Sequence, residues 1–201
     1  MIETELIKSI SDGFKKFQEV VSNKTESLSL KDSLNVKETG KNGFENFQNR
    51  IESVIDSEKR NFEKLKKDSD YSPAITDSVR KPEELLHYQK IGLQEDEVNG
   101  RAALVKREID PDFKGPGPGG RTNLERMEAG LAPFDSNGQK IELHHIGQKQ
   151  DSPYAELTHH EHKQDGNNTM LHDVDIKESH VENRNSPRVA HWKARAEQFK
   201  M

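Results

Sequence analysis

The first half of the chain has the apolar spacing of amphipathic helices. In residues 2–21, apolar side chains recur every three or four positions, which predicts a helix. A polar stretch separates it from a second apolar stripe over 44–65, which predicts a helix of about six turns. Pro82, followed by two glutamates, predicts the start of a short helix that reaches Tyr88. We therefore expect residues 1–110 to be a helical region that packs on itself or on a partner.

Glycine and proline then interrupt the chain. Residues 115–120 consist only of these two residue types, a composition that excludes a helix or a central strand. We place a linker at 111–122, between the helical region and a C-terminal domain at 123–201. The chain has no run of about 18 apolar residues, and its first residues lack the pattern of a cleavable signal peptide. The sequence therefore predicts no membrane-spanning segment.

The C-terminal domain begins with a short helix and a turn. Asn123 is a candidate N-cap for a helix over 124–129. The dipeptide Asn137-Gly138 is typical of a tight hairpin turn. Alternation of polar and apolar residues over 139–146 then predicts a half-buried strand.

A second strand and a helix follow. Residues 154–158 predict a short strand that begins directly after a proline. Thr158 is a candidate N-cap for a helix that begins at His159, and Glu161 completes the pattern of a capping box. Together with the helices upstream, these elements predict an α+β protein with a small frame that can carry one metal ion.

Composition limits the kind of core and the kind of site. Only 30% of residues are hydrophobic and 33% are charged, which favours modest cores over one large core. There is no cysteine, so disulfides, thiolate metal sites and cysteine nucleophiles are excluded. The net charge of −5 argues against a protein that coats nucleic acid by bulk electrostatics.

Histidines are concentrated in one region. Eight of the nine lie within residues 144–191. His144 and His145 end the predicted strand, His162 lies on the predicted helix, and His172 follows a polar turn. Three neutral imidazoles with an open coordination position suit a catalytic transition metal such as zinc, although structural metal sites and solvated histidines share this composition. No spacing argument brings in the other four, which are His159, His160, His180 and His191.

An ordered set of residues in this half has a familiar pattern. Its members are Asn123, Arg126, Met127, Gly130, Leu131, Ala132, Pro133, Asp135 and Gly138, then Leu143-His144-His145, then Ala155-Glu156-Leu157-Thr158 with Glu161-His162, and finally Leu171-His172. This set resembles the LHH family, nuclease toxin domains of the HNH/endonuclease VII superfamily, over about residues 100–201. The combination is much more specific than any one of its parts.

The resemblance implies a ββα-metal fold and a metal-dependent endonuclease. His144, His162 and His172 would hold one divalent ion, with zinc favoured and magnesium, manganese or nickel as alternatives. His145 would be the general base that activates water.

The sequence has no clear counterpart of the asparagine that gives HNH its middle letter. Gln148 or Glu156 would then orient the base, and the residues leave this choice open.

Basic residues are the candidates for substrate phosphate. The last eighteen residues hold five basic side chains against one acidic, although an exposed helix face has the same appearance. Contacts restricted to the backbone would give little sequence specificity. The candidates are Arg121, Arg126, Lys149, Arg184, Arg188, Lys193 and Arg195.

The resemblance also implies a context. LHH domains occur at the C-termini of polymorphic bacterial toxins, including LXG-type proteins exported by the type VII pathway. The helical region would then serve secretion or delivery, and a cognate immunity protein would bind the nuclease in the producer's cytoplasm. The target would be nucleic acid in the cytoplasm of another cell, with DNA favoured. The alternatives are an RNase with the same site and a non-catalytic adaptor that binds metal through histidines.

Overall fold

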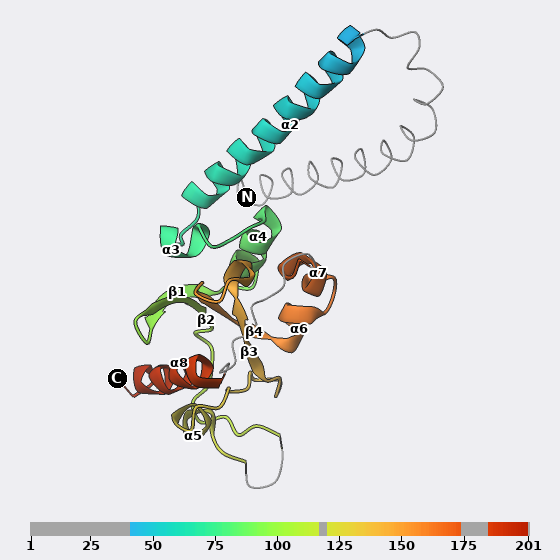
Figure 1. Ribbon diagram of the computed structural model, residues 1–201. Coiled ribbons are helices and arrows are strands. Elements are labelled where there is room, and N and C mark those ends of the chain that lie inside the picture. The colour runs from blue at the N-terminus through green and yellow to red at the C-terminus, as the bar shows by residue number, and fades with distance from the viewer. Residues whose placement is uncertain (1–40, 117–119, 174–184, 201) are drawn as a thin grey trace. The chain divides into compact units, whose positions relative to one another are not determined.

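We describe a computed structural model of the chain, which covers residues 41–116, 120–173 and 185–200 (Figure 1). Contacts divide the chain into two units, one up to Asn61 and one from Phe62 onward. Helix α2, Lys41–Lys67, includes the helix predicted over 44–65 and crosses this boundary. The helix predicted over 2–21 lies outside the described residues.

The second unit mixes short helices with short strands. Its helices are α3 (Pro73–Thr76), α4 (Pro82–Lys90), α5 (Asn123–Glu128), α6 (His159–Lys163), α7 (Asn167–Leu171) and α8 (Asn185–Gln198), and the 3₁₀ turn η1 is Ile146–Gln148. Its strands are β1 (Gln94–Val98), β2 (Arg101–Val105), β3 (Ile141–His145) and β4 (Tyr154–Thr158). The α+β expectation is therefore correct. No helix in the described ranges is long and apolar enough to cross a membrane.

The four strands form one sheet in the order β1-β2-β4-β3. β1 and β2 are antiparallel, β2 runs parallel to β4, and β4 is antiparallel to β3. The two strands predicted at 139–146 and 154–158 are β3 and β4. The division into domains around 111–122 stays a prediction, and the sheet takes strands from both sides of that segment.

The hairpin of β1 and β2 corrects the expectation that residues 1–110 are helical. The chain turns at Asn99 and Gly100, which have positive φ angles of 54° and 72°. Two successive residues with positive φ form the kind of turn that matches the twist of antiparallel strands, and Asn-Gly favours it strongly. The apolar run 102–105 is thus part of a strand.

The sheet has a core on each face. One face packs against α3, α4 and α7, with Leu104 and Leu157 from the sheet fully buried there. The other face packs against α5 and α8, with Leu143 and Trp192 among its buried residues. Figure 1 shows α5 and α8 away from α4, α6 and α7. The two faces of β3 therefore present successive side chains to two different environments.

The helix caps agree with the prediction at α6 and differ by one residue at α5. Thr158 and Glu161 form the predicted capping box. At α5 the N-cap is Thr122. Asn123 is instead fully buried, and its amide joins the main chain of Asp110 and Phe134. Because the Asn123 amide is buried and hydrogen-bonded to the main chain of two loops, it cannot also accept from the N–H groups of the first helical turn.

Candidate functional site

Three histidine rings converge between β3, α6 and the end of α7. His162 Nε2 lies 3.1 Å from His144 Nδ1 and 3.2 Å from His172 Nε2. The nitrogens that these three residues turn toward one another all lie within 4.8 Å. His144 and His162 are buried, and His172 is half-buried. Of the eight histidines in the C-terminal region, the structure thus gathers the three that were predicted to hold an ion.

The outer nitrogens of two of these rings are protonated. His162 Nδ1 lies 2.6 Å from Glu142 Oε2, and His172 Nδ1 lies 3.0 Å from the Asn168 carbonyl oxygen. A carboxylate and a carbonyl only accept hydrogen bonds, so each Nδ1 must donate. In the neutral rings, both Nε2 atoms therefore direct a lone pair into the cluster.

The third ring is backed by a buried carboxylate. His144 Nε2 is buried without a hydrogen bond and lies 3.9 Å from Oε1 of Glu84, which is itself buried on α4. The same Oε1 accepts from Tyr88 Oη at 2.8 Å and from Gly147 N at 3.0 Å. Burial raises the pKa of Glu84, but His144 and these donors outweigh it and lower the pKa below its usual value. An ionised Glu84 favours the proton on His144 Nε2, which leaves the Nδ1 lone pair toward the cluster.

The environment also keeps His162 neutral. Burial first, and then the neighbouring His144 and His172, lower the pKa of its ring to about 4 against the opposing effect of Glu142. In the tautomers that these partners favour, three lone pairs would face one another, an arrangement that a cation among them stabilises. Three imidazoles, two of them backed by a carboxylate, are a donor set that fits a divalent ion. The cluster could therefore bind a metal.

His145 occupies the other face of the same strand. It pairs with Tyr154 in the β3–β4 register, whereas His144 pairs with Ala155. Its Nδ1 lies 3.0 Å from the Lys149 carbonyl oxygen, so Nδ1 carries the proton and Nε2 is the basic nitrogen of the neutral ring. Its ring packs against Tyr154 with 4.6 Å between centroids. This tautomer is the one that a general base needs.

A tight turn after β3 positions both histidines. Gly147 has a φ of 66°, and a Cβ there would overlap the Ser78 carbonyl oxygen. Gln148 follows with a φ of 58° and accepts from Arg80 Nη1 at 2.9 Å. The turn thus ends the strand directly after His145 and packs it onto the segment before α4.

The two residues predicted to orient His145 have other hydrogen-bond partners in the described part of the chain. Gln148 joins Arg80 and the main-chain nitrogen of Asp173. Glu156 is fully buried and accepts from Lys106 N, His191 Nε2 and Arg195 Nε, each at 2.9 Å. The main chain of Lys149 holds the ring instead.

The predicted phosphate ligands separate into distinct groups. Arg195 is buried against Glu156, so the expectation that it faces substrate is wrong. Arg126 is occupied by the Ala132 carbonyl at 2.8 Å and by the Phe134 ring. Arg188 donates to the Leu143 carbonyl at 2.6 Å, on the His145 side of β3. The exposed candidates are Arg121, Lys149 and Lys193, and Arg184 lies outside the described residues.

The sequence reasoning missed two carboxylates that support the histidines. Glu142 lies two positions before His144 on β3. Because residues i and i+2 of a strand point to the same face, this spacing could have placed Glu142 on the face of His144. Glu84 had no such signal, because α4 and β3 are far apart in the chain and meet only in the folded protein.

Comparison with known families agrees with this geometry. Residues 122–198 match LHH, a nuclease of the HNH/ENDO VII superfamily with conserved LHH. This segment is an LHH nuclease domain. Leu143, His144 and His145 lie within it, and the match to a nuclease family identifies the segment as a phosphodiester hydrolase domain. No curated protein and no solved structure matched the chain.

The matched segment contains β3, β4, α5, α6, α7 and α8 but not the whole sheet. β2, which pairs with β4, and Glu84, which backs His144, both lie upstream of it. The LHH domain is therefore built together with residues outside the matched segment.

Proposed function

We propose that the protein is a metal-dependent endonuclease that uses one divalent ion held by His144, His162 and His172. The supporting observation is the convergence of one nitrogen from each of the three rings, two of which have an outer nitrogen that donates to an oxygen acceptor. We favour zinc because it accepts three imidazoles and retains an open position. Nickel and manganese are the nearer alternatives, and magnesium fits less well because it prefers oxygen ligands.

The chain's own residues would carry the proton transfer. When bound, the ion would supply Lewis-acid stabilisation of the negative charge that develops on the phosphate oxygens. His145 would accept the proton of the attacking water at Nε2. The Lys149 carbonyl would keep the proton on Nδ1 and would stabilise the imidazolium that forms.

We favour DNA as the substrate. Tyr154 and Trp192 are only 4% and 3% exposed, so neither offers a face on which an unpaired base can stack. Non-specific recognition would then depend on phosphate contacts. RNA remains the second candidate, because the hydrolytic site makes no distinction between the two sugars.

The biological setting is a separate part of the proposal and is supported by the family resemblance. In this setting the protein is an antibacterial toxin of the LXG type, secreted by the type VII route through the N-terminal region and inhibited by a cognate immunity protein. It would act in the cytoplasm of the target cell. Growth arrest on expression of the wild type, and normal growth with His145→Ala, is the expected result; equal growth of both strains would contradict the toxin role.

Cleavage assays test the catalytic proposal. Protein stripped with EDTA is supplied with zinc, nickel, manganese or magnesium and incubated with supercoiled plasmid or with RNA. We expect nicking and linearisation of the plasmid only when metal is restored. Undiminished cleavage in excess EDTA would contradict the role of the ion, and cleavage of RNA alone would contradict the choice of DNA.

A further inference from the structure

Two arginines surround the Tyr154 ring on the sheet face that carries His145. The Cζ atom of Arg101, on β2, lies 5.2 Å from the centroid of the Tyr154 ring, and that of Arg188, on α8, lies 5.9 Å from it. The centroid of the His145 ring lies 4.6 Å from the same point. Elements that are distant in sequence thus bring two guanidinium groups and the proposed general base around one aromatic ring.

Strand register explains why Arg101 reaches this place. Ala103 pairs with Tyr154 in the parallel β2–β4 ladder. Arg101 lies two positions earlier on β2 and therefore shares the face of Ala103 and Tyr154. His145, the antiparallel partner of Tyr154, lies on that face as well. The sheet itself, and not a long side chain alone, places Arg101 on the face that carries His145.

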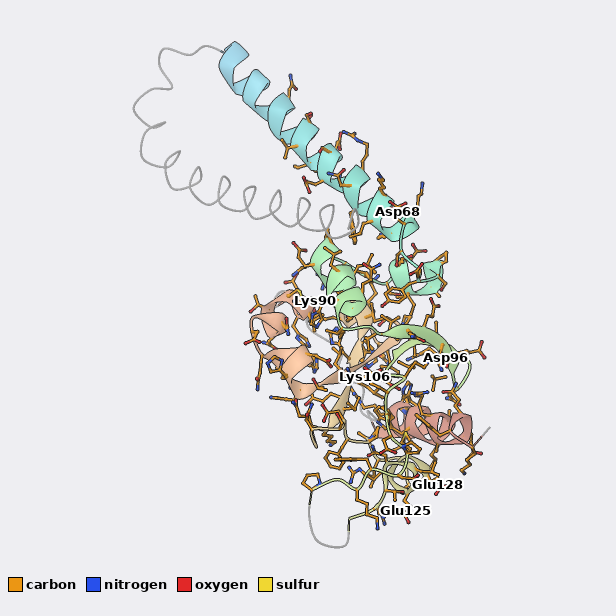
Figure 2. All side chains as sticks on the ribbon, turned by 180° about the vertical axis from the view of Figure 1, so that it is seen from behind. Asp68, Lys90, Asp96, Lys106, Glu125 and Glu128 are labelled. Atoms are coloured by element: carbon orange, nitrogen blue, oxygen red, sulfur yellow. The ribbon has the colours of Figure 1, made fainter. Side chains whose placement is uncertain are left out.

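Neither arginine has a carboxylate partner in the part of the chain that the structure describes. Arg188 donates to a carbonyl, and the printed interaction of Arg101 is with the aromatic ring. Other arginines of the same unit differ in this respect, since Arg107 pairs with Asp96 at 2.8 Å and Arg195 with Glu156 at 2.9 Å. Figure 2 labels Asp96 on β1.

A pair of cations without counter-ions attracts an anion. An aromatic ring orients a guanidinium but does not neutralise it, so its donors remain suited to a phosphate. Arg101 and Arg188 are both half-buried, which leaves part of each side chain accessible while limiting its freedom. Their place around the ring that also contacts His145 suits a nucleic-acid backbone that presents a phosphodiester bond to this base.

We propose that Arg101 binds a backbone phosphate adjacent to the scissile one, together with Arg188. The proposal rests on the nuclease function proposed above and extends it to a residue of β2, upstream of the LHH segment. In this arrangement, β2 contributes to substrate binding as well as to the sheet. Arg101 contacts the substrate backbone and carries no base preference.

Salt-dependent binding tests this proposal. A fluorescently labelled DNA duplex is titrated with zinc-loaded full-length His145→Ala protein at several salt concentrations, with and without Arg101→Gln. We expect Arg101→Gln to weaken binding by about tenfold at low salt, as for the loss of a charge-assisted contact. The slope of log affinity against log salt should fall by about 1, which corresponds to one phosphate contact. Arg101→Lys should retain most of the slope.

Arg107→Gln is the matched control. Arg107 follows β2, is 47% exposed and is neutralised by Asp96, so its removal should leave both affinity and slope unchanged. An Arg101→Gln protein with the same affinity and slope as its parent would overturn the proposal. A loss of affinity with an unchanged slope would overturn it too, because the lost contact would not be to a phosphate.

Wild-type cleavage in parallel separates this proposal from the proposed function. If wild-type protein cleaves the duplex and Arg101→Gln has no effect on binding, only the role of Arg101 fails. If wild-type protein neither binds nor cleaves nucleic acid, the nuclease proposal fails first. In the wild-type background, Arg101→Gln should raise KM more than it lowers kcat, whereas His145→Ala should act on kcat.

Discussion

Replacement of Glu142 by alanine should weaken metal binding without unfolding the protein. Glu142 Oε2 accepts the proton of His162 Nδ1 at 2.6 Å, and this contact sets the tautomer in which Nε2 faces the cluster. Without the carboxylate, the proton can move to Nε2, and the ring can rotate. The side chain of Glu142 is 29% exposed, so its loss leaves no large cavity.

The expected size of the effect follows from this contact. Removal of a carboxylate behind a ligating histidine costs about 10- to 100-fold in metal affinity. Partial exposure of Glu142 reduces the electrostatic share of this effect, so we expect a value near the lower limit, about tenfold or 1.4 kcal/mol. Glu142→Gln retains an acceptor for Nδ1 and should lose less.

Calorimetric titration of zinc into EDTA-stripped, dialysed protein measures the affinity directly. Glu128→Ala is the control, because Glu128 is a surface carboxylate on α5 that pairs with Lys200 at 2.8 Å (Figure 2). Both variants should unfold near the wild-type temperature when no metal is present. Equal zinc affinity of Glu142→Ala, Glu128→Ala and wild type would refute the reasoning that Glu142 sets the tautomer of His162.

Three further predictions concern stability. Glu156→Gln should lower the free energy of unfolding by about 3–5 kcal/mol in urea titrations, because the buried charge of Arg195 would lose its counter-charge; a loss below about 1 kcal/mol would contradict this. Gly147→Ala should destabilise the protein more than Gly92→Ala, since both have positive φ but only the Cβ at 147 overlaps a carbonyl oxygen; equal losses would contradict the close packing. Zinc at 100 times its Kd should stabilise the wild type by about 2.7 kcal/mol in thermal unfolding and His162→Ala by much less; equal stabilisation would place the ion elsewhere.

The histidine cluster was predictable because its signals are local. β4 and the capping box of α6 have clear sequence patterns, and they carry His162 to its place. The end of β3 at His145 follows from the glycine turn. Each of these signals spans fewer than ten residues, so no knowledge of the fold was needed.

The supporting residues depend on contacts between distant segments. Glu84 meets His144, and Arg80 meets Gln148, only after α4 packs against the sheet. Arg101 reaches Tyr154 only through the parallel pairing of β2 with β4. Local periodicity contains no information on such pairings, so it could not predict the hydrogen bonds of Gln148 with Arg80 and Asp173.

The β1–β2 hairpin was missed although its signal is present in the sequence. Asn99-Gly100 separates two runs of five residues that became strands. β1 is rich in acidic residues and has no apolar alternation, because it is an edge strand with one partner. Apolar periodicity therefore gave a weaker indication than the turn dipeptide.

The most direct test of the account combines zinc binding and plasmid cleavage for three proteins: wild type, His145→Ala and His162→Ala. We expect the wild type to bind one zinc ion and to cleave the plasmid. His145→Ala should bind zinc with unchanged affinity and cleave at least a hundredfold more slowly, as for the loss of a general base. His162→Ala should lose both zinc binding and cleavage. Cleavage by zinc-loaded His145→Ala at the wild-type rate would contradict the account.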